Sequence, residues 1–234
     1  MAGNTFRSGR WLGVAVAVGA SIAGVTGVAL AAGEPGASAP ATTTTTTVTR
    51  TASVTASSAQ TLVHLTIAPA TNANTYRRTA DFGGWTKVSG CEDTRAALLI
   101  RTSAAPVTFT TAKHCTVKTG RWTDPWSGVT TTIAHDFDID HTVPLANAWE
   151  HGASSWTHAK RVAYANDLAD VNHLVPIALG ENRSKGDRGP ESWKPPSHGA
   201  WCKYAKTWDR IKAKWHLSAT AAEWSALVAM AKTC

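Results

Sequence analysis

Acidic residues are scarce in this sequence: 16 Asp and Glu stand against 23 Lys and Arg in 234 residues, which leaves a formal net charge of +7. Charged residues of either sign make up only 17% of the chain, and hydrophobic residues make up 43%. This composition excludes a wholly disordered chain and a polytopic membrane protein. The length suits one domain with extra segments, or two small domains. The excess of basic residues indicates an anionic partner, such as nucleic acid or anionic lipid.

Cysteine is also scarce, with four residues in the chain, and no CxxC pair occurs. The absence of CxxC argues against a zinc site with four cysteine ligands. An even cysteine count in an exported chain instead predicts two disulfides. Four cysteines allow three pairings, and we favour the two that close local loops, Cys91 with Cys115 and Cys202 with Cys234.

The N-terminal segment lacks acidic residues and has the pattern of an export signal. Arg7 and Arg10 precede an uncharged run from Trp11 to Gly33, and Ala29-Leu30-Ala31 forms a small-x-small cleavage site. We therefore predict a signal peptide over residues 1–31 and a secreted, extracellular or cell-wall-associated protein. An uncleaved anchor is the alternative, since the run approaches the roughly 20 residues that span a bilayer. Cleavage would lower the net charge from +7 to +5.

Residues 32–60 consist mostly of Ala, Thr, Ser, Gly and Pro, with six threonines in a row at Thr42–Thr47. Such a segment buries too little apolar surface to offset its ordering entropy, so it predicts a disordered linker. The folded part is then a single domain over residues 61–234, and no internal repeat divides it.

Local patterns predict several elements in this domain. CEDTRAALLI predicts a short helix with Asp93 near its start. The β-branched stretch Val129–Ile139 predicts a strand or hairpin, and a helix is expected after Pro144. Thr220 and Glu223 form a capping-box pattern at the start of a final helix.

The stretch HDFDIDHTVPL carries the first chemical signal. If it is a strand, alternation places Asp136, Asp138 and Asp140 on one face, with His141 following directly. Carboxylates this close repel one another unless a divalent cation or a cationic partner lies among them. A structural calcium loop is the alternative, but the continuation of an EF-hand is missing.

The stretch VNHLVPIALGENRSKGD carries the second signal. The apolar run His173–Leu179 predicts a strand, and Gly180 marks a turn into a helix. Asn182, Arg183 and Lys185 then fall near the helix start, where free backbone N–H groups favour an anion. A strand ending in Asp-His, a second strand and a helix follow the order of a ββα-metal unit.

DIDHTVPL, followed 41 residues after His141 by Asn182, resembles the HNH nuclease superfamily, with His141, His173 and Asn182 at its three signature positions. Further matching segments are YRR, FGGW, CEDTR, TGRWTDPWSG, AWEHGA, RVAYANDL, WKPP and WCKYAKTW. Together they resemble the secreted bacterial HNH endonuclease family, which is related to the GmrSD-type C-terminal nuclease domain. The resemblance covers about residue 62 to the end. It implies an α+β fold: a ββα-metal core embedded in a mainly helical, disulfide-stapled single domain.

The resemblance also implies a catalytic set. His141 would be the general base, while Asp140 and Asn182 would hold one divalent metal ion, Mg²⁺ or in its place Mn²⁺. Asp138 would join the metal ligands or orient a neighbour. His173 would support the site by hydrogen bonding, or would ligate a softer ion such as Zn²⁺ or Ni²⁺.

The expected substrate is DNA, cut with little sequence specificity by a monomer that has no stable membrane association after signal cleavage; no protein partner can be inferred. Arg161, Arg183 and Lys185 are the candidate phosphate contacts, and Lys185 is also a candidate catalytic residue. The segment 183–214, with nine Lys or Arg and three acids, is the expected DNA-facing flank. An RNase using the same site and a noncatalytic exported binding module are the alternatives.

Tryptophan is unusually frequent, with 11 residues against four Phe and three Tyr. Most, including Trp85, Trp149, Trp156 and Trp224, recur beside apolar residues and are expected in the core. Trp122, Trp126 and Trp193 lie near Gly or Pro and are candidates for stacking on bases in a substrate groove.

Overall fold

The computed structural model describes residues 62–234, so the predicted signal peptide and linker lie outside the described residues. The helices are α1 (Arg78–Phe82), α2 (Thr94–Thr102), α3 (Leu145–Glu150), α4 (His158–Ala165), α5 (Leu179–Lys185), α6 (Trp201–Trp215) and α7 (Ala221–Ala231). The strands are β1 (Lys87–Ser89), β2 (Glu92–Asp93), β3 (Thr108–Phe109), β4 (Val117–Thr123), β5 (Thr130–Ile133), β6 (Phe137–His141) and β7 (Leu174–Ala178).

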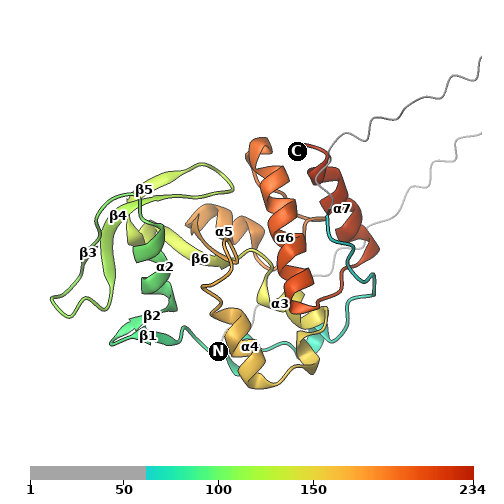
Figure 1. The fold of residues 1–234 in the computed structure, drawn as a ribbon, viewed down its shortest axis with the longest axis horizontal. Coiled ribbons are helices and arrows are strands. Elements are labelled where there is room, and N and C mark those ends of the chain that lie inside the picture. Colours follow the sequence, from blue (N-terminus) through green and yellow to red (C-terminus); the bar gives the residue numbers. More distant parts are fainter. Residues whose placement is uncertain (1–61) are drawn as a thin grey trace, which may run out of the picture. The chain divides into compact units, whose positions relative to one another are not determined.

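The strands form three small antiparallel sheets, β1-β2, β3-β4-β5 and β6-β7 (Figure 1). Helices α6 and α7 pack against each other, and α5 contacts both β6 and β7. The predicted α+β class is therefore confirmed. Within residues 62–234, no helix is long and apolar enough to cross a bilayer.

Side-chain caps fix two helix starts that the sequence predicts. The Asp93 carboxylate accepts a hydrogen bond from the Ala96 amide at 2.8 Å, which caps α2. At α7, the Thr220 hydroxyl accepts from the Glu223 amide at 3.1 Å, and the Glu223 side chain completes the capping box. Both helices therefore begin where a short polar side chain satisfies the free N–H groups of the first turn.

The prediction of one strand or a hairpin over Val129–Ile139 is wrong, because the segment forms two strands that belong to different sheets. Strand β5 ends at Ile133, a 3-10 turn spans Ala134–Asp136, and β6 begins a new sheet at Phe137. The chain must turn because β5 pairs with β4 whereas β6 pairs with β7. Asp136 therefore lies in the turn, where its carboxylate accepts a hydrogen bond from the Thr131 hydroxyl at 2.8 Å. Only Asp138 and Asp140 share a strand face.

Strands β6 and β7 form an antiparallel pair in which Asp140 is opposite Val175 and His141 is opposite Leu174. Helix α5 begins directly after β7 and ends at Gly186, whose φ of +52° favours glycine. The two polar stretches thus form two paired strands and a helix in the predicted order, with α3 and α4 inserted between the strands.

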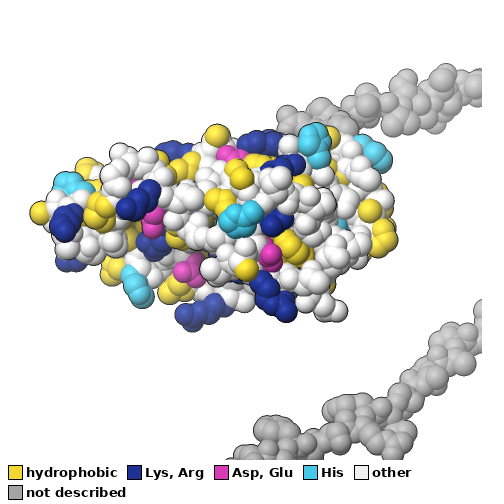
Figure 2. Space-filling model, turned by 90° about the horizontal axis from the view of Figure 1, so that it is seen from below, with side chains coloured by type: hydrophobic (Ala, Val, Ile, Leu, Met, Phe, Trp, Pro, Cys, Tyr) yellow, Lys and Arg dark blue, Asp and Glu magenta, His cyan; other side chains and the backbone are white. Residues whose placement is uncertain are grey.

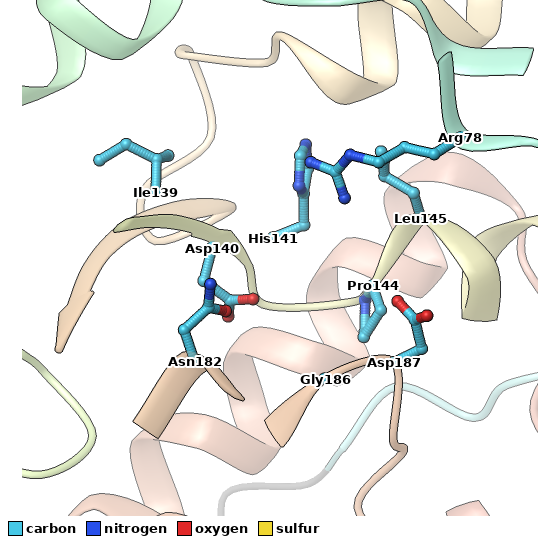
Figure 3. A pocket seen from close by; sticks show the side chains of 9 residues that line it. All are labelled: Arg78, Ile139, Asp140, His141, Pro144, Leu145, Asn182, Gly186 and Asp187. Carbon is cyan, nitrogen blue, oxygen red and sulfur yellow. The ribbon is translucent and has the colours of Figure 1, made fainter. Parts of the chain in front are cut away.

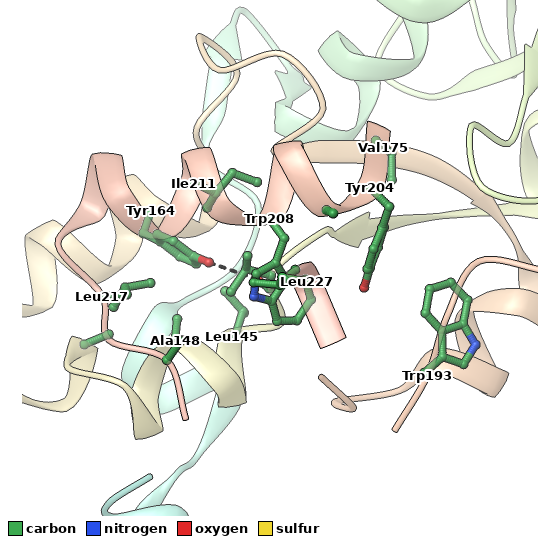
Figure 4. Close-up of a cluster of buried hydrophobic side chains, with 14 of the residues drawn as sticks. Leu145, Ala148, Tyr164, Val175, Trp193, Tyr204, Trp208, Ile211, Leu217 and Leu227 are labelled. Atoms are coloured by element: carbon green, nitrogen blue, oxygen red, sulfur yellow. Dashed lines mark hydrogen bonds between the residues drawn. The ribbon is translucent and has the colours of Figure 1, made fainter. Parts of the chain in front are cut away.

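The β6-β7 pair lies between two hydrophobic clusters. Phe137, Ile139 and Leu174 belong to a cluster with Leu98 and Trp122. Val175 and Ile177 belong to a larger cluster, part of which is drawn in Figure 4, that includes the aromatic and aliphatic side chains of α6. The register is fixed because a slip by one residue would carry the Asp138 and Asp140 carboxylates to the face on which Phe137 and Ile139 pack.

Both disulfides join the cysteines that the sequence favours. Cys91–Cys115 and Cys202–Cys234 each have a Cα–Cα distance of 5.1 Å. The second bond ties the first turn of α6 to the residue that ends the chain.

A buried polar network lies where α6 meets α7. The Glu223 carboxylate receives the Lys212 ammonium at 2.5 Å and the Trp208 indole N–H at 2.6 Å, and the His151 ring lies 3.4 Å away. Burial lowers the pKa of His151 to about 4; the Lys212 charge acts in the same direction and Glu223 opposes it. His151 is therefore neutral in the folded protein at neutral pH.

Removing the second disulfide should destabilise the fold. The bond closes a loop with a sequence separation of 32. In the chain-entropy model, such a loop contributes about 3 to 4 kcal/mol. We expect the Cys202→Ser/Cys234→Ser double variant of the full chain to lose that much unfolding free energy in denaturant titrations. An unchanged midpoint would show that the bond does not restrain the unfolded chain.

His151 should make the stability depend on pH. Its folded pKa of about 4 lies below its ordinary value of 6.5. The contribution of His151 is therefore complete above pH 6.5 and is lost as the pH falls toward 4, because the unfolded chain binds the proton more tightly. Relative to His151→Gln, the wild type should lose roughly 1 to 3 kcal/mol across this interval. The exposed His135→Gln serves as the control, and parallel curves for wild type and His151→Gln would contradict the expectation.

Candidate active site

A cleft of about 170 Å³ opens where β6 ends (Figure 3). It is lined by residues of α1, β6, the start of α3 and the end of α5, namely Arg78, Ile139, Asp140, His141, Pro144, Leu145, Asn182, Gly186 and Asp187. Asp140 and His141 are consecutive in a strand, so their side chains leave opposite faces of it. They line one cleft because the strand stops there and Pro144 starts the turn into α3.

Asp140 is a buried carboxylate, 7% exposed. Its Oδ1 atom accepts a hydrogen bond from the Lys185 ammonium at 2.9 Å, whereas its Oδ2 atom is buried and has no hydrogen-bond partner among the described residues. Burial raises the pKa of Asp140, and the neighbouring Lys185 charge opposes that rise. One carboxylate oxygen is thus held, and the other is left for a further cation.

His141 is fixed on two sides. Its Nε2 atom lies 2.9 Å from the Ala165 carbonyl oxygen, which can only accept, so Nε2 carries the proton and Nδ1 is the acceptor. The ring stacks on Trp85 with a centroid distance of 5.5 Å and an interplanar angle of 14°. Burial lowers the pKa of His141 well below 6.5, and nearby His173 lowers it further. The ring is therefore a neutral, oriented proton acceptor.

Asn182 is oriented by Asp138. The Asn182 Nδ2 atom donates to Asp138 Oδ2 at 2.8 Å, which leaves the amide oxygen as an acceptor. Figure 3 shows the Asn182 and Asp140 side chains pointing toward one another. Asp138 therefore takes the orienting role, which is one of the two alternatives that the sequence leaves open.

Lys185 lies elsewhere than the sequence predicts. The side chain is fully buried, and its ammonium donates to Asp140 Oδ1 and to the His141 carbonyl oxygen, each at 2.9 Å. The prediction of a phosphate contact by Lys185 is wrong for this geometry, because α5 packs onto β6 with this side chain inside. Lys185 is a positioning residue for two consecutive residues of the cleft.

His173 is 1% exposed and lies behind His141, with a centroid distance of 6.1 Å between the rings. Its ring packs edge-on against Tyr164 at 4.6 Å. Burial lowers its pKa to about 4, although the nearby Asp167 and Asp170 carboxylates and the Tyr164 backbone oppose that fall. Neither ring nitrogen reaches hydrogen-bond geometry with a described residue, so the contact with His141 is one of packing.

The arginine side chains predicted to contact phosphate lie away from the cleft or bind other parts of the protein. Arg161 donates to the carbonyl oxygens of Asp81, at 2.9 Å, and of Trp156, and its guanidinium lies over the Trp149 ring. These contacts engage the side chain within the protein, and the phosphate contact by Arg161 stays a prediction. Arg183 is exposed on α5 but does not line the cleft.

The predicted DNA-facing flank is also interrupted. Lys185 and Lys212 are buried, while Arg210 and Lys214 are paired with Asp170 and Asp167. On the face seen in Figure 2, Lys and Arg side chains are spread out rather than gathered into one patch.

Three residues at the site were not predicted. Arg78 is exposed on α1, and in Figure 3 its guanidinium lies beside the His141 ring. Asp187 lines the cleft just beyond α5, and Trp85 supports His141. Arg78 and Trp85 lie more than 50 residues from His141 in sequence, so no local pattern places them there.

The three tryptophans that the sequence nominates for base stacking are in the core instead. Trp122, Trp126 and Trp193 are 1%, 0% and 7% exposed. Their indoles pack among apolar side chains, and the Trp122 N–H donates to the Leu99 carbonyl oxygen at 2.8 Å.

Among the described residues, no group of three or more His, Cys, Asp or Glu side chains is placed to hold a metal ion. Oxygen donors in the cleft include Asp140 Oδ2, the Asn182 amide oxygen and the Asp187 carboxylate. The orphaned carboxylate oxygen and the oriented amide fit a hard cation that completes its coordination with water and substrate oxygens.

Comparison with known proteins identifies a secreted fungal relative. No protein-family model matches the chain. No solved structure matches it either. A protein of Arthroderma benhamiae, described as an uncharacterized secreted protein, is 42% identical over 180 residues, which cover 76% of this chain and 86% of that protein. At this identity and coverage, the chain belongs to the same family as this secreted fungal protein.

Proposed function

We propose that this protein is a secreted, metal-dependent endonuclease that hydrolyses phosphodiester bonds of DNA with little sequence specificity. One observation carries the proposal. Strand β6 and helix α5, which β7 joins to the same unit, bring His141, Asp140 and Asn182 to one cleft, in the order that the resemblance to the HNH family implies.

His141 would act as the general base. With Nε2 held by the Ala165 carbonyl, the neutral ring offers Nδ1 to a water molecule. As Nδ1 takes the water proton, the water oxygen forms a bond to phosphorus, the P–O bond to the leaving sugar oxygen breaks, and that oxygen takes a proton from solvent. The Trp85 stack and the Ala165 contact keep the ring from rotating during this step.

Asp140 and Asn182 would hold a divalent cation, Mg²⁺ or Mn²⁺. Such ions prefer oxygen ligands, and Mg²⁺ commonly takes only one or two from protein. When bound, the cation would polarise the phosphate and stabilise charge on the leaving oxygen. Asp138 and Lys185 would serve by positioning: Asp138 orients the Asn182 amide, and Lys185 occupies Asp140 Oδ1 so that Oδ2 faces no other protein donor.

Arg78 would bind the phosphate. It is the exposed guanidinium in the cleft lining, and a guanidinium donates charge-assisted, bidentate hydrogen bonds to phosphate oxygens. Its place beside His141 would hold the phosphorus atom near the attacking water.

Export is supported by independent features. The N-terminal pattern is that of a signal peptide, the two disulfides suit an oxidising compartment, and the Arthroderma relative is a secreted protein.

The proposed base can be tested by plasmid nicking. The full chain should nick DNA with Mg²⁺ or Mn²⁺ and stop when the metal is chelated. His141→Ala should lower the rate by about 10² to 10⁴, the typical value of general-base catalysis, whereas the exposed His135→Ala should cut normally.

Retained cutting by His141→Ala would sink this mechanism. Salt-sensitive DNA binding without cleavage across a panel of divalent metals would favour the noncatalytic binding module. Equal digestion of RNA in the same assay would extend the substrate class.

Arg78 can be tested against its neighbour Arg77, which is also exposed but whose guanidinium donates to the carbonyl oxygens of Asn74 and Tyr76. Arg78→Ala should lower kcat/KM for DNA by about 10- to 100-fold, because a charged hydrogen bond to the phosphate is lost. Arg77→Ala should have a small effect. Equal effects of the two variants would show that only the net charge matters.

A further inference from the structure

A second hollow, of about 190 Å³, adjoins the cleft. Its lining consists of Arg78, Thr79, Gly83, Gly84, Trp85, His141, Leu145 and Ala165. Arg78, His141 and Leu145 line both hollows, so a ligand whose phosphate lies at Arg78 can extend from one into the other. Nothing in the proposed hydrolysis uses this second space.

One side of the hollow is formed by the aromatic ring of Trp85, and another side is formed by two glycine residues. Trp85 is half-buried, its ring stacks on His141, and both residues line the hollow. Gly83 ends α1 with a φ of +69°, a conformation that favours glycine. Gly84 has no such constraint, and a Cβ atom added there would meet nothing within 4 Å. Residue 84 thus lines the hollow without a side chain, and the structure has room for one there.

Hydrogen bonds fix the position of the segment that carries Trp85 relative to His141. The Asn166 side chain accepts a hydrogen bond from the Thr86 amide at 2.9 Å and donates to the Gly84 carbonyl oxygen at 3.2 Å. Asn166 directly follows Ala165, whose carbonyl oxygen holds His141. The same turn at the end of α4 thus fixes the proposed base and both ends of the segment that carries Trp85.

We propose that this hollow binds one nucleobase of the nucleic acid substrate, stacked against Trp85, while the adjoining phosphate contacts Arg78. The inference rests on the proposed nuclease function and names a subsite within it. The volume lies below the roughly 300 to 1,000 Å³ of pockets for drug-sized ligands, and so suits a single ring system. Stacking on an aromatic side chain accepts any base, which agrees with low sequence specificity.

The experiment uses the full chain and two fluorescein-labelled single strands of equal length, one of DNA and one whose residues are all abasic. Binding is measured by anisotropy in the presence of chelator, so no cleavage is required. The wild type should bind the base-bearing strand more tightly. Gly84→Leu, which adds a bulky side chain to the lining of the hollow, should weaken that binding by about 5- to 150-fold and leave binding of the abasic strand unchanged.

Gly84→Ala should give a smaller loss, which keeps the test decisive if the leucine variant folds poorly. Gly180→Leu is the matched control, since Gly180 also has nothing within 4 Å of an added Cβ and lines neither hollow. Circular dichroism verifies the fold of each variant.

Equal binding of the two strands by the wild type, or equal losses for both strands in Gly84→Leu, would overturn the subsite. Metal-dependent nicking is measured separately on the same samples. A protein that nicks DNA but shows no base-dependent binding refutes only the subsite, whereas base-dependent binding without nicking refutes only the nuclease proposal.

Discussion

The cleft depends on the buried ion pair between Lys185 and Asp140. Burial raises the pKa of the Asp140 carboxyl, which is 7% exposed, and the Lys185 ammonium at 2.9 Å opposes that rise. The same ammonium donates to the His141 carbonyl oxygen, so one side chain of α5 fixes two consecutive residues of β6. Buried ion pairs contribute little net stability, because desolvation offsets their attraction. The consequence of this pair is geometric: it leaves a single carboxylate oxygen, Oδ2, without a protein partner.

Rigid packing surrounds this pair. Strands β6 and β7 are held between two hydrophobic clusters, and the end of α4 supplies both the Ala165 carbonyl that holds His141 and the Asn166 side chain that holds the Trp85 segment. His173 fills the space behind His141 as a neutral ring. The Asp140, His141 and Asn182 side chains are therefore oriented by the protein itself, which the proposed general-base chemistry would require.

Sequence reasoning succeeded where the signal is local. Capping residues, cysteine spacing and the strand, strand and helix order depend on neighbours in the chain, and these place Asp140, His141 and Asn182 at one end of β6. It failed for residues whose role depends on whether the side chain is buried or exposed. Lys185 and the tryptophans nominated for stacking were assigned to the substrate, yet each lies inside. A basic or aromatic residue type does not reveal whether its side chain faces solvent or the core.

The sequence by itself determined the two disulfides and the helix caps from spacing along the chain, and it predicted the α+β class and the three polar residues of the cleft through its resemblance to the HNH family. Only the tertiary structure decided which basic side chains are buried and which are exposed at the cleft. It turned Lys185 inward and brought Arg78 and Trp85 to His141 from α1 and the segment after it. These placements depend on how α1, α4 and α5 pack around β6, and packing between distant segments leaves no periodicity in the sequence that would reveal it.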